Sequence, residues 1–540
     1  MQAVIQAEWQ DLFSDKAAVL QLENQVLPAY LKRMRWFGGK ARPSMSVLIY
    51  QNIPIEAGND FTHYLLLKVR YPEFPTDIYA LPIAFIAERR FNDMPSEAII
   101  ARLDNLVSPG YLIDAVYLEE FRNALFQMMQ HSKKLLASNH YPMIADGGKL
   151  LQNSSVNKIS SKVLSAEQSN TSLVFNNQFF LKFFRKLEYT INPDLEIIRY
   201  LTEQEQFHQI PGYAGAIEVL HPEKPPMLAV MLQRMIENAG NAWDWNLQHL
   251  QRFYEQVMET GFDKTQLPER PPKHHISWEE TPAALQQLIG QEVYQQASLL
   301  GKRTAELHLA LGKDAKNPDF GPEQFDKTMQ QSYCDSLQKL LIQKFDLLQR
   351  NLARIPESMQ AKATEMLDDR ENVIEFIQKI TTQPAIGTGI RTHGDFHLGQ
   401  VLVAGNDLVI LDFEGEPDKP FNQRRKKTSP LKDVAGMMRS YRYAAYAVLL
   451  TKFENAPQRQ ESLFTVADLW YHFVSRYFLG AYLDTMKGSH LLPAGEAFNE
   501  TLQIFSFEKA IYELGYELNN RPDWAIIPLI SLAKFVKFYL

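Results

Sequence analysis

Short apolar runs separated by turn residues fill the first part of the chain. Such runs cover 47–50, 64–69 and 79–86, and Pro54 and Gly58 are among the turn-favouring residues between them. Apolar runs of this length, bounded by Pro, Gly and Asn, are typical of β-strands. The pattern therefore predicts a strand-rich N-terminal region.

A helix is predicted next. Leu118, Phe121, Leu125 and Met128 recur at spacings of three and four residues, which is the apolar stripe of a helix. Strand-like runs return in 162–184 and again in 227–232, which indicates a second group of strands. Asn176 and Asn177 separate two of these runs, as in a tight hairpin.

After Gly240 the spacing is helical to the end of the chain, with one strand-like interruption at 402–403 and 408–411. Gly405 and Asn406 lie between these two short runs and predict a hairpin. A strand-rich region followed by a helical region indicates an α+β protein. A bilobal kinase is one of several α+β folds with this order of elements.

Composition limits the classes of protein that fit. The chain has 540 residues, of which 45% are hydrophobic and 22% charged, and its formal net charge is −7. These values fit a folded protein of more than one subdomain, and they favour neither a nucleic-acid partner nor an anionic membrane surface. Cys334 is the only cysteine, so no disulfide can form within the chain. With no signal peptide or membrane span predicted, we expect a cytoplasmic protein.

The most informative stretch is Thr392-His393-Gly394-Asp395. Gln400 follows Asp395 by five residues, and Asp412 lies beyond the predicted hairpin. Phosphoryl transfer needs a carboxylate to accept the proton of the attacking hydroxyl, and oxygen ligands to hold Mg²⁺. The five-residue gap matches the spacing in kinase catalytic loops. We therefore predict Asp395 as the catalytic base, and Gln400 and Asp412 as Mg²⁺ ligands.

Two other sites could use the same stretch. His393, Asp395 and His397 alternate, so on a strand they could bind a metal ion from one face. Asp395 with Asp412 or Glu414 could also form the acid and base of a glycosidase.

A lysine in an apolar strand predicts the nucleotide site. Lys182 lies within the apolar run 179–184, where a cation is costly unless it is paired or faces a cleft. Asn192 and Pro193 then mark the start of a helix whose first turns contain Glu196. A strand lysine paired with a helix glutamate holds the α- and β-phosphates in kinases, so Lys182 and Glu196 are predicted to bind ATP. An unpaired lysine at a strand edge is the alternative.

The segment before Lys182 has no glycine, unlike the phosphate loop of many kinases. Small polar side chains and backbone N–H groups can still hold phosphate, although a polar hairpin turn has the same composition. The further residues that we assign to nucleotide binding are Ser169, Asn170, Thr171, Gln233 and Met235.

These motifs together resemble the bacterial maltokinases, which belong to the aminoglycoside-phosphotransferase-like branch of the protein-kinase-like superfamily. The resemblance runs from about residue 35 to residue 524. Besides the catalytic stretch, it is carried by Arg35-Trp36-Phe37-Gly38-Gly39-Lys40, by Glu167-Gln168-Ser169-Asn170-Thr171-Ser172, by Asp412-Phe413-Glu414-Gly415-Glu416-Pro417, and by the segments 429–437 and 512–524.

The resemblance implies a bilobal protein-kinase-like fold. Its parts would be an N-terminal cap (1–105), an intermediate ATP-binding subdomain (106–234) and a helical C-lobe (235–540). The implied activity is the ATP- and Mg²⁺-dependent phosphorylation of maltose at its anomeric hydroxyl. Maltose 1-phosphate would then feed α-glucan (glycogen) synthesis from trehalose, with trehalose synthase as a possible partner.

Residues near the C-terminus fit a sugar site by their spacing as well. Tyr512, Tyr516 and Asn520 recur every four residues on one predicted helix face. An ion-pair ladder beside a packed tyrosine row would have the same spacing. The predicted sugar-binding residues are His393, Glu414, Tyr512, Glu513, Tyr516, Asn520 and Arg521, and Asp433 is predicted to brace the catalytic loop.

Two rival functions stay open. One is a kinase for another sugar, such as an amino sugar, which a negatively charged pocket would favour. The other is an inactive kinase-like module that binds a trehalose-metabolising enzyme. The presence of Lys182, Asp395, Gln400 and Asp412 together argues against the inactive module.

Overall fold

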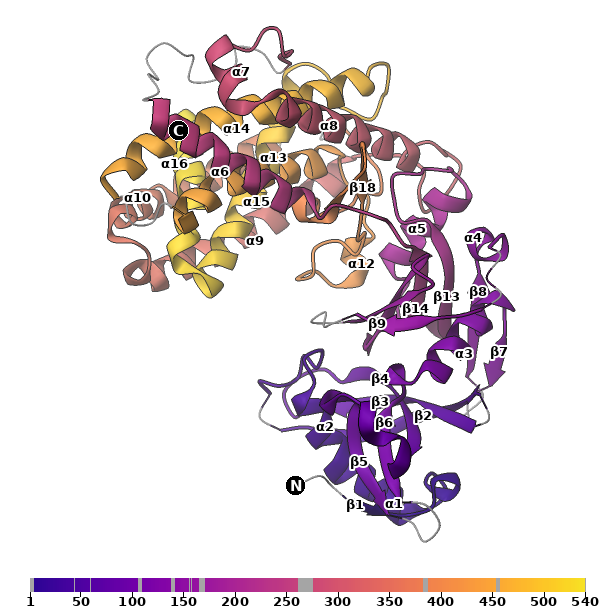
Figure 1. Cartoon of the computed structure of the whole chain (residues 1–540). Coiled ribbons are helices and arrows are strands. Elements are labelled where there is room, and N and C mark those ends of the chain that lie inside the picture. Colours follow the sequence, from indigo (N-terminus) through magenta and orange to yellow (C-terminus); the bar gives the residue numbers. More distant parts are fainter. Residues whose placement is uncertain are drawn as a thin grey trace. The chain divides into compact units, whose positions relative to one another are not determined.

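The computed structural model describes residues 4–539, apart from 43, 59, 105–108, 137–140, 155, 157, 165–169, 261–274, 382–386 and 453–456. The chain folds into two compact units, Met1–Ile236 and Glu237–Leu540. The first is rich in strands and the second in helices, which confirms the predicted α+β class (Figure 1). The predicted three-part division stays a prediction.

The first unit begins with a sheet of order β1-β5-β6-β4-β3-β2. All its neighbours are antiparallel except the parallel pair β1 and β5. The three predicted strands are confirmed, and each is longer than predicted. The strands are β1 Val4–Gln6, β2 Ser46–Ala57, β3 Asp60–Arg70, β4 Asp77–Ala87, β5 Ile99–Asp104 and β6 Gly110–Asp114.

One turn prediction is wrong. Pro54 was expected between strands, but it lies within β2, opposite His63 of β3. Because β2 is the last strand of this sheet, the missing N–H of a proline interrupts no ladder on the outer side.

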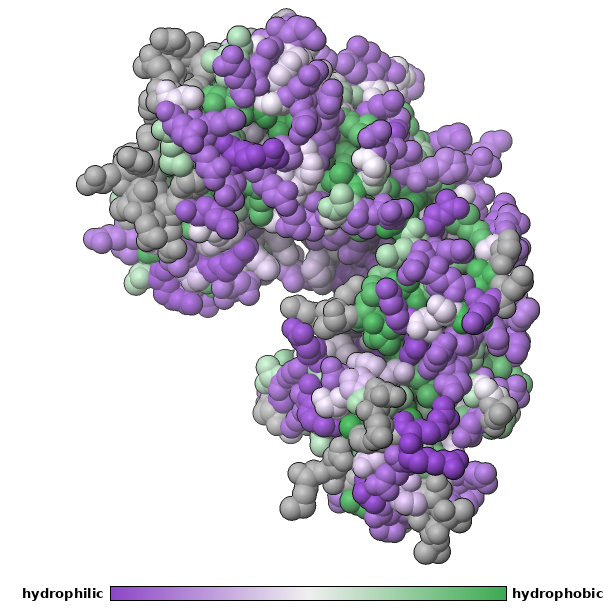
Figure 2. Space-filling view, in the orientation of Figure 1, coloured by the Kyte–Doolittle hydropathy of each residue, from purple (hydrophilic) through white to green (hydrophobic). Residues whose placement is uncertain are grey.

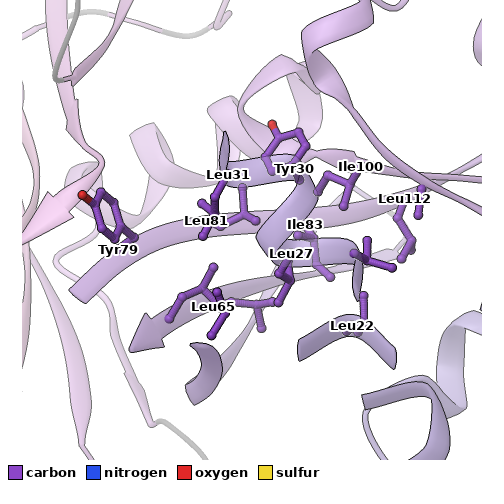
Figure 3. Close-up of a cluster of buried hydrophobic side chains, with 14 of the residues drawn as sticks. Leu22, Leu27, Tyr30, Leu31, Leu65, Tyr79, Leu81, Ile83, Ile100 and Leu112 are labelled. Atoms are coloured by element: carbon purple, nitrogen blue, oxygen red, sulfur yellow. The ribbon is translucent and has the colours of Figure 1, made fainter. Parts of the chain in front are cut away.

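Helices α1 (Lys16–Gln21) and α2 (Leu27–Arg33) supply one side of the core of this region. Leu27 and Leu31 from α2 pack with Leu65 and Leu81 from the sheet, and all four are fully buried. Figure 3 shows these side chains together, with Tyr30 and Tyr79 also drawn. Burial of such side chains contributes about 1.5–3 kcal/mol each, so this core is the main source of stability here.

A second sheet follows, of order β7-β8-β13-β14-β11-β10-β9. The predicted hairpin between β10 and β11 is confirmed, because Asn176 and Asn177 both have φ of 51°. The predicted helix is α3 (Glu119–Gln130), and α5 (Pro193–Glu203) also belongs to this region. The strands are β7 Lys134–Leu136, β8 Pro142–Gly147, β9 Ser161–Val163, β10 Asn170–Phe175, β11 Phe179–Phe184, β13 Tyr213–His221 and β14 Lys224–Arg234.

The second unit consists mainly of helices. Helix α13 packs against α6, α14 and α15, and α8 packs against α14. The predicted hairpin is confirmed as β17 (Val401–Ala404) and β18 (Asp407–Ile410). The longer helices are α6 Ala242–Thr260, α8 Gln291–Leu311, α9 Lys327–Asn351, α10 Glu357–Asp368, α11 Arg370–Thr381, α13 Leu431–Lys452, α14 Pro457–Thr485, α15 Glu496–Asn520 and α16 Ile526–Tyr539.

One small ladder in this unit was not predicted. Strands β15 (Glu323–Gln324) and β16 (Thr388–Gly389) pair with each other. Two-residue strands are too short to show an alternating pattern, so the sequence gives no signal for them.

The face of the molecule in Figure 2 is covered largely by hydrophilic residues, with smaller hydrophobic patches between them. In the described part of the chain, none of the helices has the length and apolar character needed to cross a bilayer.

Candidate active site

Helix α13 forms the platform of the catalytic loop. The carboxylate of Asp433 accepts the backbone N–H groups of His393 (2.8 Å) and Gly394 (3.0 Å). One turn on, a side chain at Gly436 would meet the carbonyl of Phe396 at 2.8 Å, so only glycine allows this approach. Ser440 accepts the N–H of Leu398 with its hydroxyl. Gly436 and Ser440 follow Asp433 by three and seven residues, so all three lie on one helix face. The segment 429–437 therefore supports the loop, and Asp433 makes the contacts assigned to it.

A buried histidine holds Asp433 from the other side. His308 of α8 lies with its Nε2 3.1 Å from Asp433 Oδ2, and its Nδ1 is 3.0 Å from the hydroxyl of Tyr482 on α14. Since a carboxylate only accepts, Nε2 carries a proton and donates it to Asp433. Burial alone would raise the pKa of Asp433, but the hydrogen bond and charge of His308 outweigh it and lower that pKa. The brace is therefore an anion fixed by helices α8, α13 and α14.

His393 ties the loop to the segment after the hairpin. Its Nε2 donates to the carbonyl of Leu411 at 2.8 Å, and its ring packs between Phe396 and Phe413 with centroids 5.0 Å away. We expected His393 to contact a sugar. The side chain is only 1% exposed, so the structure gives it a structural role instead.

The two glycine-containing motifs meet at this point. Gly394 has φ of 88°, and a side chain there would lie 3.1 Å from Cα of Gly415. A glycine is needed here for both reasons, the left-handed backbone and the close approach. Spatial contact thus explains why His393-Gly394-Asp395 and Asp412-Phe413-Glu414-Gly415 occur in the same chain.

The predicted metal ligands lie side by side. Gln400 Nε2 is 3.2 Å from Asp412 Oδ2, and Asp412 and Glu414 offer oxygens within 4.8 Å of each other. Asp412 has φ of 63°, a strained conformation for a residue with a side chain, and such strain is concentrated at functional sites. Carboxylate and amide oxygens suit Mg²⁺. The oxygens of Gln400 and Asp412 therefore fit the predicted Mg²⁺ ion, and Glu414 is a further candidate ligand for it.

Replacing Asp412 with alanine should weaken the binding of Mg-ATP by more than about tenfold, since a charged ligand is lost. Gln400→Ala should weaken it less, because the lost ligand is neutral. Calorimetric titration of ATP with and without Mg²⁺ measures both. Equal affinity in Asp412→Ala and the unchanged protein would show that the ion binds elsewhere.

A lysine that the sequence analysis missed contacts the predicted base. Lys509 of α15 lies with its Nζ 3.0 Å from Asp395 Oδ1, and both side chains are about one-fifth exposed. Burial would lower the pKa of Lys509, but Asp395 and neighbouring carboxylates raise it, so the lysine is charged. It precedes Tyr512 by three residues, so extending the stripe from Tyr512 back by one turn would have found it.

Further charges surround this pair. Lys432 of α13 lies 2.9 Å from Glu508 and 3.2 Å from Glu416, and Lys419 lies 2.6 Å from Glu416. Burial would raise the pKa of Glu416, but Lys432 and Lys419 lower it to about 2. Acidic and basic groups alternate here, so this surface is not simply negative.

This lowered pKa predicts an acid dependence of stability. Because the folded pKa of Glu416 is about 2 and its ordinary value is 4.5, its ionic contacts stabilise the fold above pH 4.5 and are lost as the pH falls toward 2. Glu416→Gln should therefore be less stable at neutral pH, with a difference that shrinks in this window. Urea unfolding at several pH values tests it. A difference that stays constant down to the lowest pH would contradict it.

The predicted sugar residues separate into two groups. Tyr512 is the nearer to the base: Lys509 Nζ lies 5.0 Å from the centre of its ring, and its hydroxyl donates to Asp418 at 3.1 Å. Asn520, which donates to the carbonyl of Tyr516, lies about 16 Å further along the helix axis than Lys509.

Two charged members of the set have protein partners. Glu513 pairs with Arg439, whose Nη1 also donates to Ser531, and Arg521 pairs with Glu517 at 2.8 Å. The Glu513–Arg439 pair joins α15 to α13. The Glu517–Arg521 pair lies at the C-terminal end of α15. The structure brings Tyr512 to the surroundings of Asp395, and the sugar contacts of the whole C-terminal set stay predictions.

In the first unit, Lys182 has a partner that the sequence analysis did not assign. Its Nζ lies 2.8 Å from Oδ2 of Asp194, whose side chain is fully buried. Asn192 caps α5 by accepting the N–H groups of Asp194 and Leu195, which confirms the predicted start of the helix. The predicted pairing of Lys182 with Glu196 stays a prediction. The carboxylate two residues earlier is at the buried N-terminus of α5, where the helix dipole favours it.

Asn170, Thr171 and Gln233, also predicted to bind the nucleotide, lie on the same sheet as Lys182. Ser169 falls outside the described residues, while Asn170 and Thr171 begin β10. Gln233 is buried near the end of β14, and the N–H of Met235 donates to the carbonyl of Gln178 (2.7 Å) at the start of β11.

The alternative histidine metal site finds no support. His397 Nδ1 accepts the N–H of Gly399 at 3.1 Å, and burial lowers the pKa of His397. Within the described ranges, His393, Asp395 and His397 do not bring ligand atoms close enough to share an ion.

Comparison with known proteins gives one family match. Residues 30–117 match the maltokinase N-terminal cap domain. Two curated relatives are glucosamine kinases. The one from Streptacidiphilus jiangxiensis is 23% identical over 60% of this chain and 61% of its own length. The one from Mycolicibacterium smegmatis is 31% identical over 26% and 33%. The chain therefore matches less than two thirds of the length of each.

Solved structures show the fold over the whole chain. Glucosamine kinase in crystal form B has a TM-score of 0.62 and 15% identity, covering 98% of this chain and 100% of its own. Glucosamine kinase in complex with glucosamine, ADP and inorganic phosphate has a TM-score of 0.60, also at 15% identity, covering 92% and 94%. The chain thus combines a segment that matches the maltokinase N-terminal cap domain with the fold of these solved glucosamine kinases, which confirms its resemblance to the bacterial maltokinases.

Proposed function

We propose that this protein is an ATP-dependent sugar kinase that phosphorylates maltose at its anomeric hydroxyl to give maltose 1-phosphate. The observation that carries the proposal is the arrangement around Asp395. Its loop is held by Asp433, and the paired ligands Gln400 and Asp412 lie at the end of the adjoining hairpin. A fixed carboxylate next to oxygen ligands is what phosphoryl transfer to a hydroxyl requires.

In this reaction the anomeric oxygen of the sugar bonds to the γ-phosphorus of ATP while the bond from that phosphorus to ADP breaks. Asp395 accepts the proton of the attacking hydroxyl. Lys509, which lies 3.0 Å from Asp395, fixes the position of this carboxylate. Gln400 and Asp412 would hold Mg²⁺, which offsets the phosphate charge when it is bound with the nucleotide. Lys182, oriented by Asp194, would bind the phosphates of ATP.

Two features support maltose as the acceptor. The cap matches the maltokinase family, and 512–524 resembles the corresponding segment of that family. Glucosamine is the second candidate, because the curated and structural relatives are glucosamine kinases. The mixed charges of Glu416, Lys432 and Lys509 near Asp395 fit a neutral acceptor better than the uniformly negative surface that a cation would favour.

A phosphorylation assay tests the proposal. Maltose, glucose and glucosamine are each supplied with ATP and Mg²⁺, and the release of ADP is measured together with the loss of reducing ends. Phosphorylation at the anomeric hydroxyl removes a reducing end, whereas phosphorylation at any other hydroxyl leaves it. We expect turnover with maltose and loss of its reducing end. Turnover with glucosamine alone would assign the second candidate, and no turnover with any sugar would overturn the proposal.

Tyr512→Phe should raise the KM for the sugar by about two- to tenfold, as one hydrogen bond to a neutral group contributes about 0.5–1.5 kcal/mol. The KM for ATP should stay unchanged. Tyr516→Phe on the same helix should raise the KM for the sugar by a smaller factor, since Tyr516 is 49% exposed and lies one turn further from the base. Equal sugar kinetics in Tyr512→Phe and the unchanged protein would remove Tyr512 from the acceptor site.

The wider role follows from the product. A sugar 1-phosphate is an activated glycosyl group, so maltose 1-phosphate could feed α-glucan (glycogen) synthesis, with maltose derived from trehalose.

We propose the cytoplasm as the location, because ATP is available there. We also propose trehalose synthase as the partner that supplies maltose. Co-purification from cells with the tagged full chain tests the partner.

A further inference from the structure

We infer that the cap domain holds the nucleotide-binding strand in place through Arg185, which makes Arg185 a positioning residue for ATP. The inference rests on the proposed function in one respect, that Lys182 of β11 binds the phosphates. Arg185 follows Lys182 by three residues. It belongs to none of the motifs from which nucleotide, metal or sugar contacts were predicted.

Arg185 is buried between the two sheets of the first unit. Its side chain is 1% exposed, and its Nη2 lies 2.8 Å from Oδ2 of Asp114. Asp114 is the last residue of β6, in the first sheet (β1-β5-β6-β4-β3-β2), which we call the cap sheet. Its Nε donates at 2.8 Å to the hydroxyl of Thr171, on β10 of the second sheet. One guanidinium therefore connects the cap to the strand that pairs with β11.

The backbone makes the same connection. Directly after β11, residues Lys186–Leu187 form β12, which pairs with Ile78 and Tyr79 of β4 in the cap sheet. The N–H of Ala80 donates to the carbonyl of Arg185 at 2.7 Å. The chain thus passes from the strand of Lys182 into the cap sheet without a linker.

Two aromatic residues of the cap complete the environment. The guanidinium of Arg185 lies 4.8 Å from the centre of the Trp36 ring, and Tyr30 donates its hydroxyl to Asp114 at 3.3 Å. Trp36 belongs to the motif Arg35 to Lys40, for which the proposed catalytic and sugar sites give no role. Its contact with Arg185 supplies one.

This arrangement also limits what Thr171 can do. Thr171 was predicted to bind the nucleotide, but its side chain is 9% exposed and its hydroxyl accepts from Arg185. Thr171 lies opposite Phe183, next to Lys182 on β11.

The buried ion pair of Arg185 and Asp114 has one favourable geometry, because any displacement leaves a charge without compensation in a medium of low dielectric. A shift of the cap would therefore shift β10 and β11 with it.

The test measures nucleotide binding directly, without a sugar. Calorimetry gives the Kd for Mg-ATP of the full chain, and thermal unfolding gives its Tm. We expect Arg185→Met to raise this Kd by about fivefold or more, within the usual range of coupling between sites. Trp36→Leu leaves no charge unpaired and should raise the Kd in the same direction by a smaller factor. The KM for the sugar should be unchanged in both variants.

Arg122→Met is the matched control. Arg122 is also a buried arginine of the first unit, but its partners are Ser161 and the carbonyl of Val116. It should lower the Tm and leave the Kd unchanged. A folded Arg185→Met with unchanged Kd would overturn the inference. If Arg185→Met fails to fold, an unchanged Kd in Trp36→Leu overturns it instead. A protein that binds Mg-ATP but phosphorylates no sugar would sink the proposed function and leave the inference standing.

Discussion

Asp395→Asn is expected to lower kcat by about 10²–10⁴-fold, the usual contribution of a general base. The amide has the same shape as the carboxylate and keeps the oxygen that Lys509 contacts at 3.0 Å, so the loop should stay in place. Only the ability to accept the proton of the sugar hydroxyl is lost. Single-turnover kinetics with ATP in excess measure the chemical step, and calorimetry should give a Kd for Mg-ATP close to that of the unchanged protein.

Asp484→Asn is a suitable control for this experiment. Asp484 lies near the end of α14, is 46% exposed and pairs with Lys487 and His275 on the surface. It should leave kcat and Tm unchanged, because exposed ion pairs contribute little. If Asp395→Asn retained kcat within a few-fold of the control, Asp395 could not be the base.

Asp433→Asn is expected to destabilise the second unit by about 3–5 kcal/mol, the usual effect of breaking a buried charged pair. Asp433 is 1% exposed and fully engaged by His308 and the loop N–H groups of His393 and Gly394. An asparagine offers one acceptor oxygen in place of two. The loop should then lose part of its fixed geometry, so kcat of the folded protein should fall as well.

Asp468→Asn separates these two effects. Asp468 is another carboxylate of the second unit, with a side chain 16% exposed and bound by Arg442, Tyr446 and Lys534. This variant should lose comparable stability in urea unfolding, while kcat of the folded fraction stays normal. Equal kcat in folded Asp433→Asn and Asp468→Asn would show that Asp433 serves stability alone.

The parts of this protein that the sequence determined by itself are those set by near neighbours. Asn176 and Asn177 adopt the positive φ of a hairpin turn, and Asn192 caps its own helix, because both depend on a few adjacent residues. The spacing of Asp395 and Gln400 and the hairpin before Asp412 were also sufficient to bring Gln400 to Asp412. A five-residue loop followed by a tight hairpin leaves few other places for these side chains.

The tertiary structure decided the partners that lie far apart in the chain. Lys509 reaches Asp395 across 114 residues, and His308 reaches Asp433 across 125. Arg185 joins Asp114 to Thr171 in the same way. The periodicity of the sequence does not indicate such pairs, because the packing of helices and sheets sets the distance between their residues. Pro54 shows the same limit, since only the position of β2 at the edge of its sheet permits a proline within the strand.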